Sequence, residues 1–132
     1  MAGLSKRDRG CWLVAGYAPD GTTMAEANDA FNAFVSDASR GFAWFHDHFA
    51  DRPGGVVLLA VETPEHLEAL KHPGPLAGWD LKVHPLIFAE DGEGFLFQAD
   101  FTTTVYRKVR LRDRWDAYRN SDLFRRNEAR EV

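Results

Sequence analysis

Four short segments of the chain are rich in hydrophobic residues and have the lengths and turn boundaries of β-strands. Residues 11–17 read CWLVAGY and end at a Pro-Asp-Gly turn signal. Residues 56–62 are apolar on both alternating faces, which is typical of a central strand. Residues 81–88 alternate, and Pro85 favours an edge strand because proline cannot donate to a neighbour. The remaining candidate is residues 41–49, whose pattern also fits a helix.

Two amphipathic segments separate these strands and predict helices. Residues 23–38 begin with Thr23 and Glu26, the pair that forms a reciprocal capping box at a helix start. Their apolar side chains recur at helical spacing on one stripe: Ala27, Phe31, Phe34 and Ala38. Residues 64–71 follow a capping threonine and have proline at the first helical position.

Residues 41–49 admit two interpretations. The apolar stripe of the preceding helix can be extended through three phenylalanines, which would give one helix about 40 Å long. However, Ser39-Arg40-Gly41 is a poor helix interior, and the density of aromatic residues after it favours a strand. We therefore predict a strand, one face of which carries Phe42, Trp44, His46 and His48.

Residues 93–132 extend beyond this pattern. Residues 95–111, FLFQADFTTTVYRKVRL, are rich in threonine, valine and aromatic residues and predict an additional strand, with a helix as the alternative. Residues 112–118 and 123–130 are charged and predict helices. We expect this C-terminal extension to pack on the core formed by residues 1–92 or on a partner subunit.

The predicted order of elements is strand, helix, strand, strand, helix, strand. By the rules for short, right-handed connections, this order folds as a four-stranded antiparallel sheet with both helices on one face. We therefore predict an α+β protein with a ferredoxin-like core and a C-terminal extension of strand and helix. A single domain suits the length of 132 residues.

Composition and charge exclude several classes of protein. The net charge of -4 argues against bulk attraction to nucleic acid, although residues 94–132 carry nine Lys or Arg against six Asp or Glu. No apolar run approaches the ~20 residues of a membrane span, and the N-terminus lacks the apolar core of a signal peptide. Cys11 is the only cysteine, so no internal disulfide forms. We expect a cytoplasmic protein that binds neither nucleic acid nor membranes.

His46 and His48 are the candidate catalytic residues. An imidazole titrates near neutrality and can accept a proton from a substrate, and same-face neighbours on a strand, about 7 Å apart, can contact one ligand. The alternative is a pair of solvated histidines on an edge strand. The spacing also suits zinc, but the third ligand would have to be an acid or His84, which would lie on the opposite edge strand. We assign no metal.

Four further residues are predicted to line a ligand cavity: Trp12, Trp44, His84 and Phe88. Trp44 and Phe88 belong, with Phe42 and Leu86, to an apolar surface on the sheet face away from the helices, and this surface is too large to leave in water. The extension or a second subunit must cover it. The same aromatic residues could wall a haem, which needs one histidine ligand and an apolar pocket, but they are more often plain core. We assign no cofactor.

The phrases GGVVLLAVETPEHLEAL and WDLKVHPLI, and the spacing of elements over residues 10–89, resemble small proteins of the dimeric α/β-barrel superfamily. The resemblance implies two sheets packed face to face in a homodimer, with a cavity that binds a small, often aromatic or polyketide-like molecule. Some members oxidise such molecules without metal or flavin, and others bind haem. No catalytic residue of the family maps onto a matching position in this chain.

Two functional hypotheses follow. The first is a homodimeric small-molecule-binding protein that works as a cofactor-independent oxygenase or isomerase, with His46 and His48 as base and orienting group. The alternative is a non-enzymatic protein-interaction module that uses the basic C-terminal tail, residues 107–130.

Overall fold

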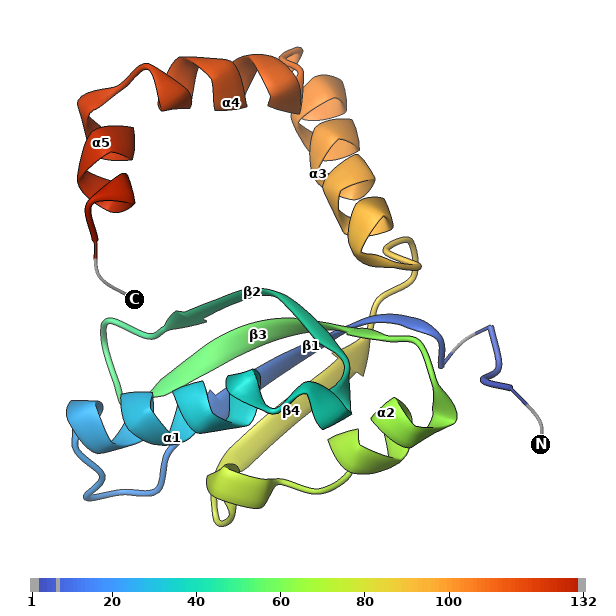
Figure 1. Cartoon of the computed structure of the whole chain (residues 1–132), viewed down its shortest axis with the longest axis vertical. Coiled ribbons are helices and arrows are strands. Elements are labelled where there is room, and N and C mark those ends of the chain that lie inside the picture. Colours follow the sequence, from blue (N-terminus) through green and yellow to red (C-terminus); the bar gives the residue numbers. More distant parts are fainter. Residues whose placement is uncertain (1–2, 7, 131–132) are drawn as a thin grey trace. The chain divides into compact units, whose positions relative to one another are not determined.

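The computed structural model describes residues 3–6 and 8–130. The chain divides after Gly94 into a core unit, which contains the sheet, and a helical unit, which begins at Phe95. The elements of the core unit are β1 (Gly10–Tyr17), α1 (Met24–Ser36), β2 (Phe42–His48), β3 (Gly54–Val61), α2 (Pro64–Leu70) and β4 (Asp80–Pro85), with short 3-10 helices at Ala38–Arg40 and Gly74–Leu76 (Figure 1).

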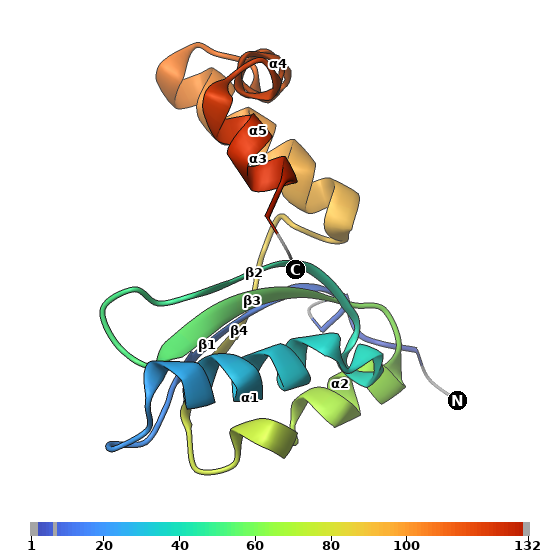
Figure 2. The ribbon, with the colours of Figure 1, turned by 60° about the vertical axis from the view of Figure 1, so that its left-hand side comes forward.

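The four strands form one antiparallel sheet in the order β2-β3-β1-β4. Both α1 and α2 lie on the same side of this sheet (Figure 2). The other side is called the open face below. The strand β3 lies between β2 and β1, and all of its residues except Val56 are buried, which explains its continuous apolar sequence. The predicted α+β class is confirmed.

The core lies between the sheet and α1. Phe31 and Phe34 of α1 are buried in one cluster with residues of β1 and β3 such as Val14 and Leu59. The predicted capping box is present, since the amide of Glu26 donates to the Thr23 hydroxyl at 3.1 Å and the amide of Thr23 donates to the Glu26 carboxylate at 3.0 Å. Hydrogen bonding of the Glu26 carboxylate to Thr23, chiefly to its backbone amide, lowers the pKa of Glu26.

The strand prediction for residues 41–49 is confirmed by β2. The helix ends at Ser36, and the chain passes through the short 3-10 turn to Gly41, which has a φ of +110°. Residues with a side chain rarely adopt this angle. A Cβ at Gly41 would also lie 2.3 Å from the Ala60 carbonyl oxygen of β3. The glycine that argued against a long helix is therefore where the strand joins the sheet.

The face predicted for the two histidines was wrong. The pairing of β2 with β3 shifts between residues 43 and 45, so Trp44 is the additional residue of a β-bulge. Beyond the bulge, His46 lies opposite Val57, which is a buried core residue on the helix side. His48 follows two residues later on the same side. One inserted residue moves every later side chain of the strand to the opposite face of the sheet. The alternation of apolar and polar residues in the sequence does not show where such an insertion occurs.

Arg40 joins the end of α1 to the end of α2. It is only 5% exposed, and its guanidinium lies 4.5 Å from the centroid of the Phe34 ring. Nη1 donates to the Asp37 carboxylate at 3.0 Å, and Nε and Nη2 donate to the His72 carbonyl at 3.3 and 3.2 Å. Hydrogen bonds from Ser39, and then the charge of Arg40, lower the pKa of Asp37. The buried charge is thus satisfied by local partners.

The fourth strand ends at Pro85 rather than Phe88. The chain nevertheless follows the start of β1, because the Cys11 amide donates to the Ala89 carbonyl at 2.8 Å and its carbonyl accepts from the Leu86 amide at 2.9 Å. Gly92 then contacts the indole of Trp44 so closely that a Cβ at this position would lie 1.7 Å from it. The segment after β4 therefore crosses one end of the open face, from β1 to β2.

The additional strand predicted within residues 95–111 was wrong, because this stretch belongs to a helix. The C-terminal helices are α3 (Gly92–Arg107), α4 (Leu111–Arg119) and α5 (Asp122–Glu128). Asp91 caps α3 by accepting from the Gly94 amide at 2.6 Å. The hydroxyls of Thr102 and Thr103 donate to backbone carbonyls of the preceding turn at 2.9 and 3.2 Å. These bonds let β-branched residues occupy the helix. The helices predicted at 112–118 and 123–130 are confirmed.

The helical unit is held by a few polar and aromatic contacts. The Leu111 amide at the start of α4 donates to the Asp100 carboxylate of α3 at 2.8 Å. The ring of Phe124 on α5 meets the rings of Trp115 and Tyr118 on α4 edge to face, with centroids 6.1 and 5.5 Å apart. In the described range 95–130, however, no residue is buried.

Candidate functional site

The histidine pair lies at the sheet edge, beside α1. The rings of His46 and His48 are 5.6 Å apart and perpendicular. The Nε2 atom of His48 is 3.1 Å from the Asn32 side-chain oxygen of α1, and its ring meets the edge of Phe31 at 6.0 Å. His46 is exposed, whereas His48 is partly buried. The pair is therefore brought together as predicted, but on the helix side of the sheet.

The two histidines have different chemical capacities. His48 can donate from Nε2 to Asn32 only if Nε2 carries the proton, which leaves Nδ1 as an unprotonated acceptor. That Nδ1 atom is buried and has no hydrogen-bond partner within the described part of the chain. His48 therefore serves as a link to α1, and His46 is the accessible imidazole.

The other predicted cavity residues do not gather around this pair. Trp44 lies on the open face, where its ring is 5.4 Å from that of Phe42. His84 lies on β4, the opposite edge strand of the sheet, where it pairs with Leu13 of β1. Phe88 is 71% exposed in the segment after β4. The structure does not bring the histidines together with Trp44 and His84 within one chain, because the bulge separates their faces.

No metal centre is formed by these residues. Within residues 3–6 and 8–130, no group of three or more His, Cys, Asp or Glu side chains could hold a metal ion. His84 is separated from the histidine pair by two central strands. His84 therefore does not join His46 and His48 as a third ligand within one chain.

Cys11 is a buried thiol with a structural role. Its Sγ–H donates to the Asp91 carbonyl at 3.3 Å, beneath the segment that crosses the open face. Burial, reinforced by the charges of Asp91 and Glu93, raises the pKa of Cys11 to about 11. Because the thiolate is the reactive form, this cysteine is a poor nucleophile near neutral pH.

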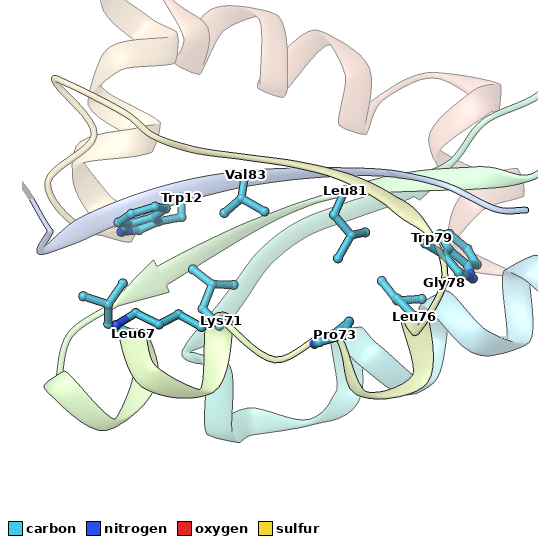
Figure 3. A pocket seen from close by; sticks show the side chains of 10 residues that line it. Trp12, Leu67, Lys71, Pro73, Leu76, Gly78, Trp79, Leu81 and Val83 are labelled. Carbon is cyan, nitrogen blue, oxygen red and sulfur yellow. The ribbon is translucent and has the colours of Figure 1, made fainter.

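Trp12 lines a hollow between α2 and the sheet, which we call the α2 hollow. It has a volume of ≈ 600 Å³. In Figure 3, Trp12, Leu81 and Val83 point into it from the sheet. The facing wall is formed by Leu67 of α2 and by Lys71, which follows that helix. The complete lining adds Leu70, Pro73, Leu76, Gly78 and Trp79. Trp12 was predicted from the sequence as a ligand-binding residue, whereas the rest of this wall was not.

The α2 hollow exists because α2 is short. It has 7 residues, against 13 in α1, and Pro73-Gly74-Pro75 prevents it from continuing. Three helix-facing side chains of β1 and β4 are therefore only half-buried, namely Trp12, Leu81 and Val83. The Pro-Gly-Pro sequence before Trp79 was the available signal for this gap.

Comparison with protein-family models, with curated proteins and with solved structures gave no match. Among the helices of the described residues, none combines the length and the apolar character needed to cross a membrane.

Proposed function

We propose that this protein forms a homodimer and binds a small organic molecule. The observation that carries the homodimer is the state of the helical unit: none of its described residues is buried, yet seven large apolar side chains are exposed. These are Leu96, Phe97, Phe101, Val105, Tyr106, Trp115 and Leu123. Helices of 16, 9 and 7 residues are marginal in water without a buried face. They need a surface on which to pack.

The open face of the sheet offers such a surface. Phe42 and Phe45 of β2 are 61% and 49% exposed, and Trp44 lies between them in the bulge. Adjacent exposed aromatic residues of this kind mark interaction sites rather than ordinary solvated surface. In the proposed homodimer, the helical unit of one subunit packs on the open face of the other.

Charge supports this pairing. Up to Gly94 the chain has seven Lys or Arg against fourteen Asp or Glu, and from Phe95 onward it has nine against six. The core unit therefore carries a net charge of -7 and the helical unit +3. Opposite charges steer two surfaces together and disfavour the pairing of two like units.

The finer fold assignment is part of the proposal. The strand order β2-β3-β1-β4, with both helices on one side, supports a ferredoxin-like core. This arrangement would agree with the resemblance to the dimeric α/β-barrel superfamily. Turnover of the bound molecule by a cofactor-independent oxygenase or isomerase reaction stays a prediction, and of the two histidines His46 is the one accessible to act as a base.

A second candidate function is docking of a different protein on the helical unit. It is favoured by a groove of ≈ 810 Å³ between α3 and α4, whose lining is mostly apolar and includes Phe95, Leu111 and Trp115. Asp100, Arg110 and Arg112 also line it. Because Arg110 lies 3.7 Å from the Asp100 carboxylate, an acidic side chain of the partner would pair with Arg112.

Sedimentation equilibrium of the full-length chain tests the homodimer. We expect wild type to dimerise and Phe42→Ser/Phe45→Ser to weaken dimerisation at least about tenfold, because both aromatic anchors are removed. Phe97→Ser/Phe101→Ser should weaken it similarly through the helical unit. Met24→Ser is the control, because Met24 is a 39% exposed apolar residue of α1, on the helix side of the sheet.

The results separate the alternatives. A monomeric wild type would contradict the homodimer and leave two alternatives, packing of the helical unit on the core of its own chain and docking of another protein. If Phe97→Ser/Phe101→Ser weakens dimerisation and Phe42→Ser/Phe45→Ser does not, two helical units pair with each other, which would contradict the proposed contact with the sheet.

A further inference from the structure

We infer that the α2 hollow binds a flat aromatic molecule that carries a carboxylate. This inference rests on the proposed binding of a small molecule and adds its place and its chemical class. The hollow lies on the helix side of the sheet, whereas Trp44 marks the open face where the proposed homodimer is buried. The two can therefore be measured independently.

The size and lining of the hollow suit a small ligand. Its volume of ≈ 600 Å³ falls within the range of about 300–1,000 Å³ that is usual for small-molecule sites. Apart from Lys71, the side chains that line it are apolar or aromatic. A ligand with an apolar body would bury the half-exposed surfaces of Leu81 and Val83, which is favourable in proportion to area.

Two tryptophans make the site selective for flat rings. Trp12 is fixed by the hydrogen bond from its Nε1–H to the Asp8 carbonyl, at 2.8 Å. Trp79 stacks on Phe31, with centroids 6.0 Å apart and an interplanar angle of 23°. Both indoles are therefore held before any ligand arrives. Aromatic ligands gain from stacked or edge-to-face contact with such rings, and fixed walls reduce the entropy lost on binding.

Lys71 determines the charge of the expected ligand. Among the described residues that line the hollow, it is the only charged one, and its stem runs along the wall formed by α2 (Figure 3). Its ammonium is 3.3 Å from the Glu68 carboxylate, but both side chains are about two-thirds exposed. Such surface pairs contribute little to stability, so Lys71 can exchange Glu68 for a ligand carboxylate. A cationic ligand would meet repulsion instead.

NMR of the four tryptophan indole N–H groups tests the inference, with naphthoate as the probe and neutral naphthamide as its uncharged counterpart. Single Trp→Phe variants assign the signals. We expect naphthoate to shift the signals of Trp12 and Trp79 in a saturable way. The signals of Trp44 and Trp115 should stay unchanged, because these residues lie on the open face and in the helical unit.

Two matched substitutions test the role of the charge. Lys71→Met should weaken naphthoate binding about fivefold while leaving naphthamide binding unchanged. Lys82→Met is the control, because Lys82 pairs with Asp80 at 3.2 Å in a similar surface pair but does not line the hollow. Val83→Phe should weaken the binding of both probes by filling the hollow.

Several results would overturn the inference. They are the absence of any shift at Trp12 and Trp79, equal effects of Lys71→Met and Lys82→Met, and saturable shifts confined to Trp44 or Trp115. The last result would leave small-molecule binding intact and place it on the dimer surface. A monomeric protein that still binds naphthoate at Trp12 and Trp79 would refute the homodimer alone.

Discussion

The immediate surroundings of single residues in this protein change their pKa values, and Cys11 is the clearest case. It is fully buried at the start of β1, and its thiol donates to the carbonyl of Asp91. Deprotonation would place a charge in an apolar site, next to two carboxylates, and would remove the hydrogen-bond donor. The pKa of about 11 expresses these costs.

We predict that native Cys11 reacts with iodoacetamide at pH 8 at least about a hundredfold more slowly than an unhindered thiol, because so little thiolate is present. The denatured chain, in which the same cysteine is exposed, is the internal control. A native rate within tenfold of the denatured rate would contradict the raised pKa.

The same pKa predicts how stability depends on pH. The folded-state pKa of Cys11, about 11, lies above the ordinary value of 9.0. The folded protein therefore favours the protonated thiol. The resulting contribution to the free energy of unfolding is complete below pH 9.0 and is lost as the pH rises through about 11. Urea unfolding of wild type and Cys11→Ala over this interval should show a steeper loss in wild type, and parallel curves would contradict the prediction.

At the scale of elements, Gly41 separates α1 from β2. Two physical constraints meet there: a φ of +110° and the Ala60 carbonyl, which occupies the space of a side chain. Gly21 has a φ of +88° but nothing within 4 Å of its missing Cβ. The two glycines share the backbone constraint and differ in the contact.

We predict that Gly41→Ala lowers the free energy of unfolding by about 3 kcal/mol or more, because strain and overpacking add. Gly21→Ala should lower it by only about 1 kcal/mol, since it meets the backbone constraint alone. Urea denaturation of both variants measures the difference. Equal losses would mean that β2 shifts away from β3 at little cost.

At the scale of the whole molecule, the two units carry opposite net charges, and this affects how strongly the proposed homodimer associates. A core unit of -7 and a helical unit of +3 attract each other in the proposed homodimer. Attraction between exposed charges is screened by salt, whereas burial of apolar surface is not.

We therefore predict that the association constant for dimerisation decreases as sodium chloride is raised from about 0.05 M to about 0.5 M, because the Debye length shrinks severalfold over this range. Sedimentation equilibrium at several salt concentrations measures the slope. Substituting Arg112 and Arg114 with glutamine should reduce this slope. Dimerisation that strengthens with salt would indicate an interface held by apolar contacts alone.

Much of the fold could be read from the sequence, because its signals act over a few residues. The capping pair of Thr23 and Glu26 starts α1, Gly41 begins the path into β2, and Pro64 opens α2. These effects depend on backbone angles and on hydrogen bonds to neighbours in the chain. The α+β class and the strand assignment of residues 42–48 followed from them.

The candidate site was less predictable, because it depends on contacts between distant segments. The bulge at Trp44 is defined by pairing with β3 and moves His46 and His48 to the helix side. The threonines of α3 fit a helix through hydrogen bonds that propensity does not count. The α2 hollow appears only where a short helix meets two longer strands. Local chemistry therefore determined which helices and strands form. Tertiary packing alone decided which faces and cavities they share, because one inserted residue or one missing helical turn changes every contact beyond it.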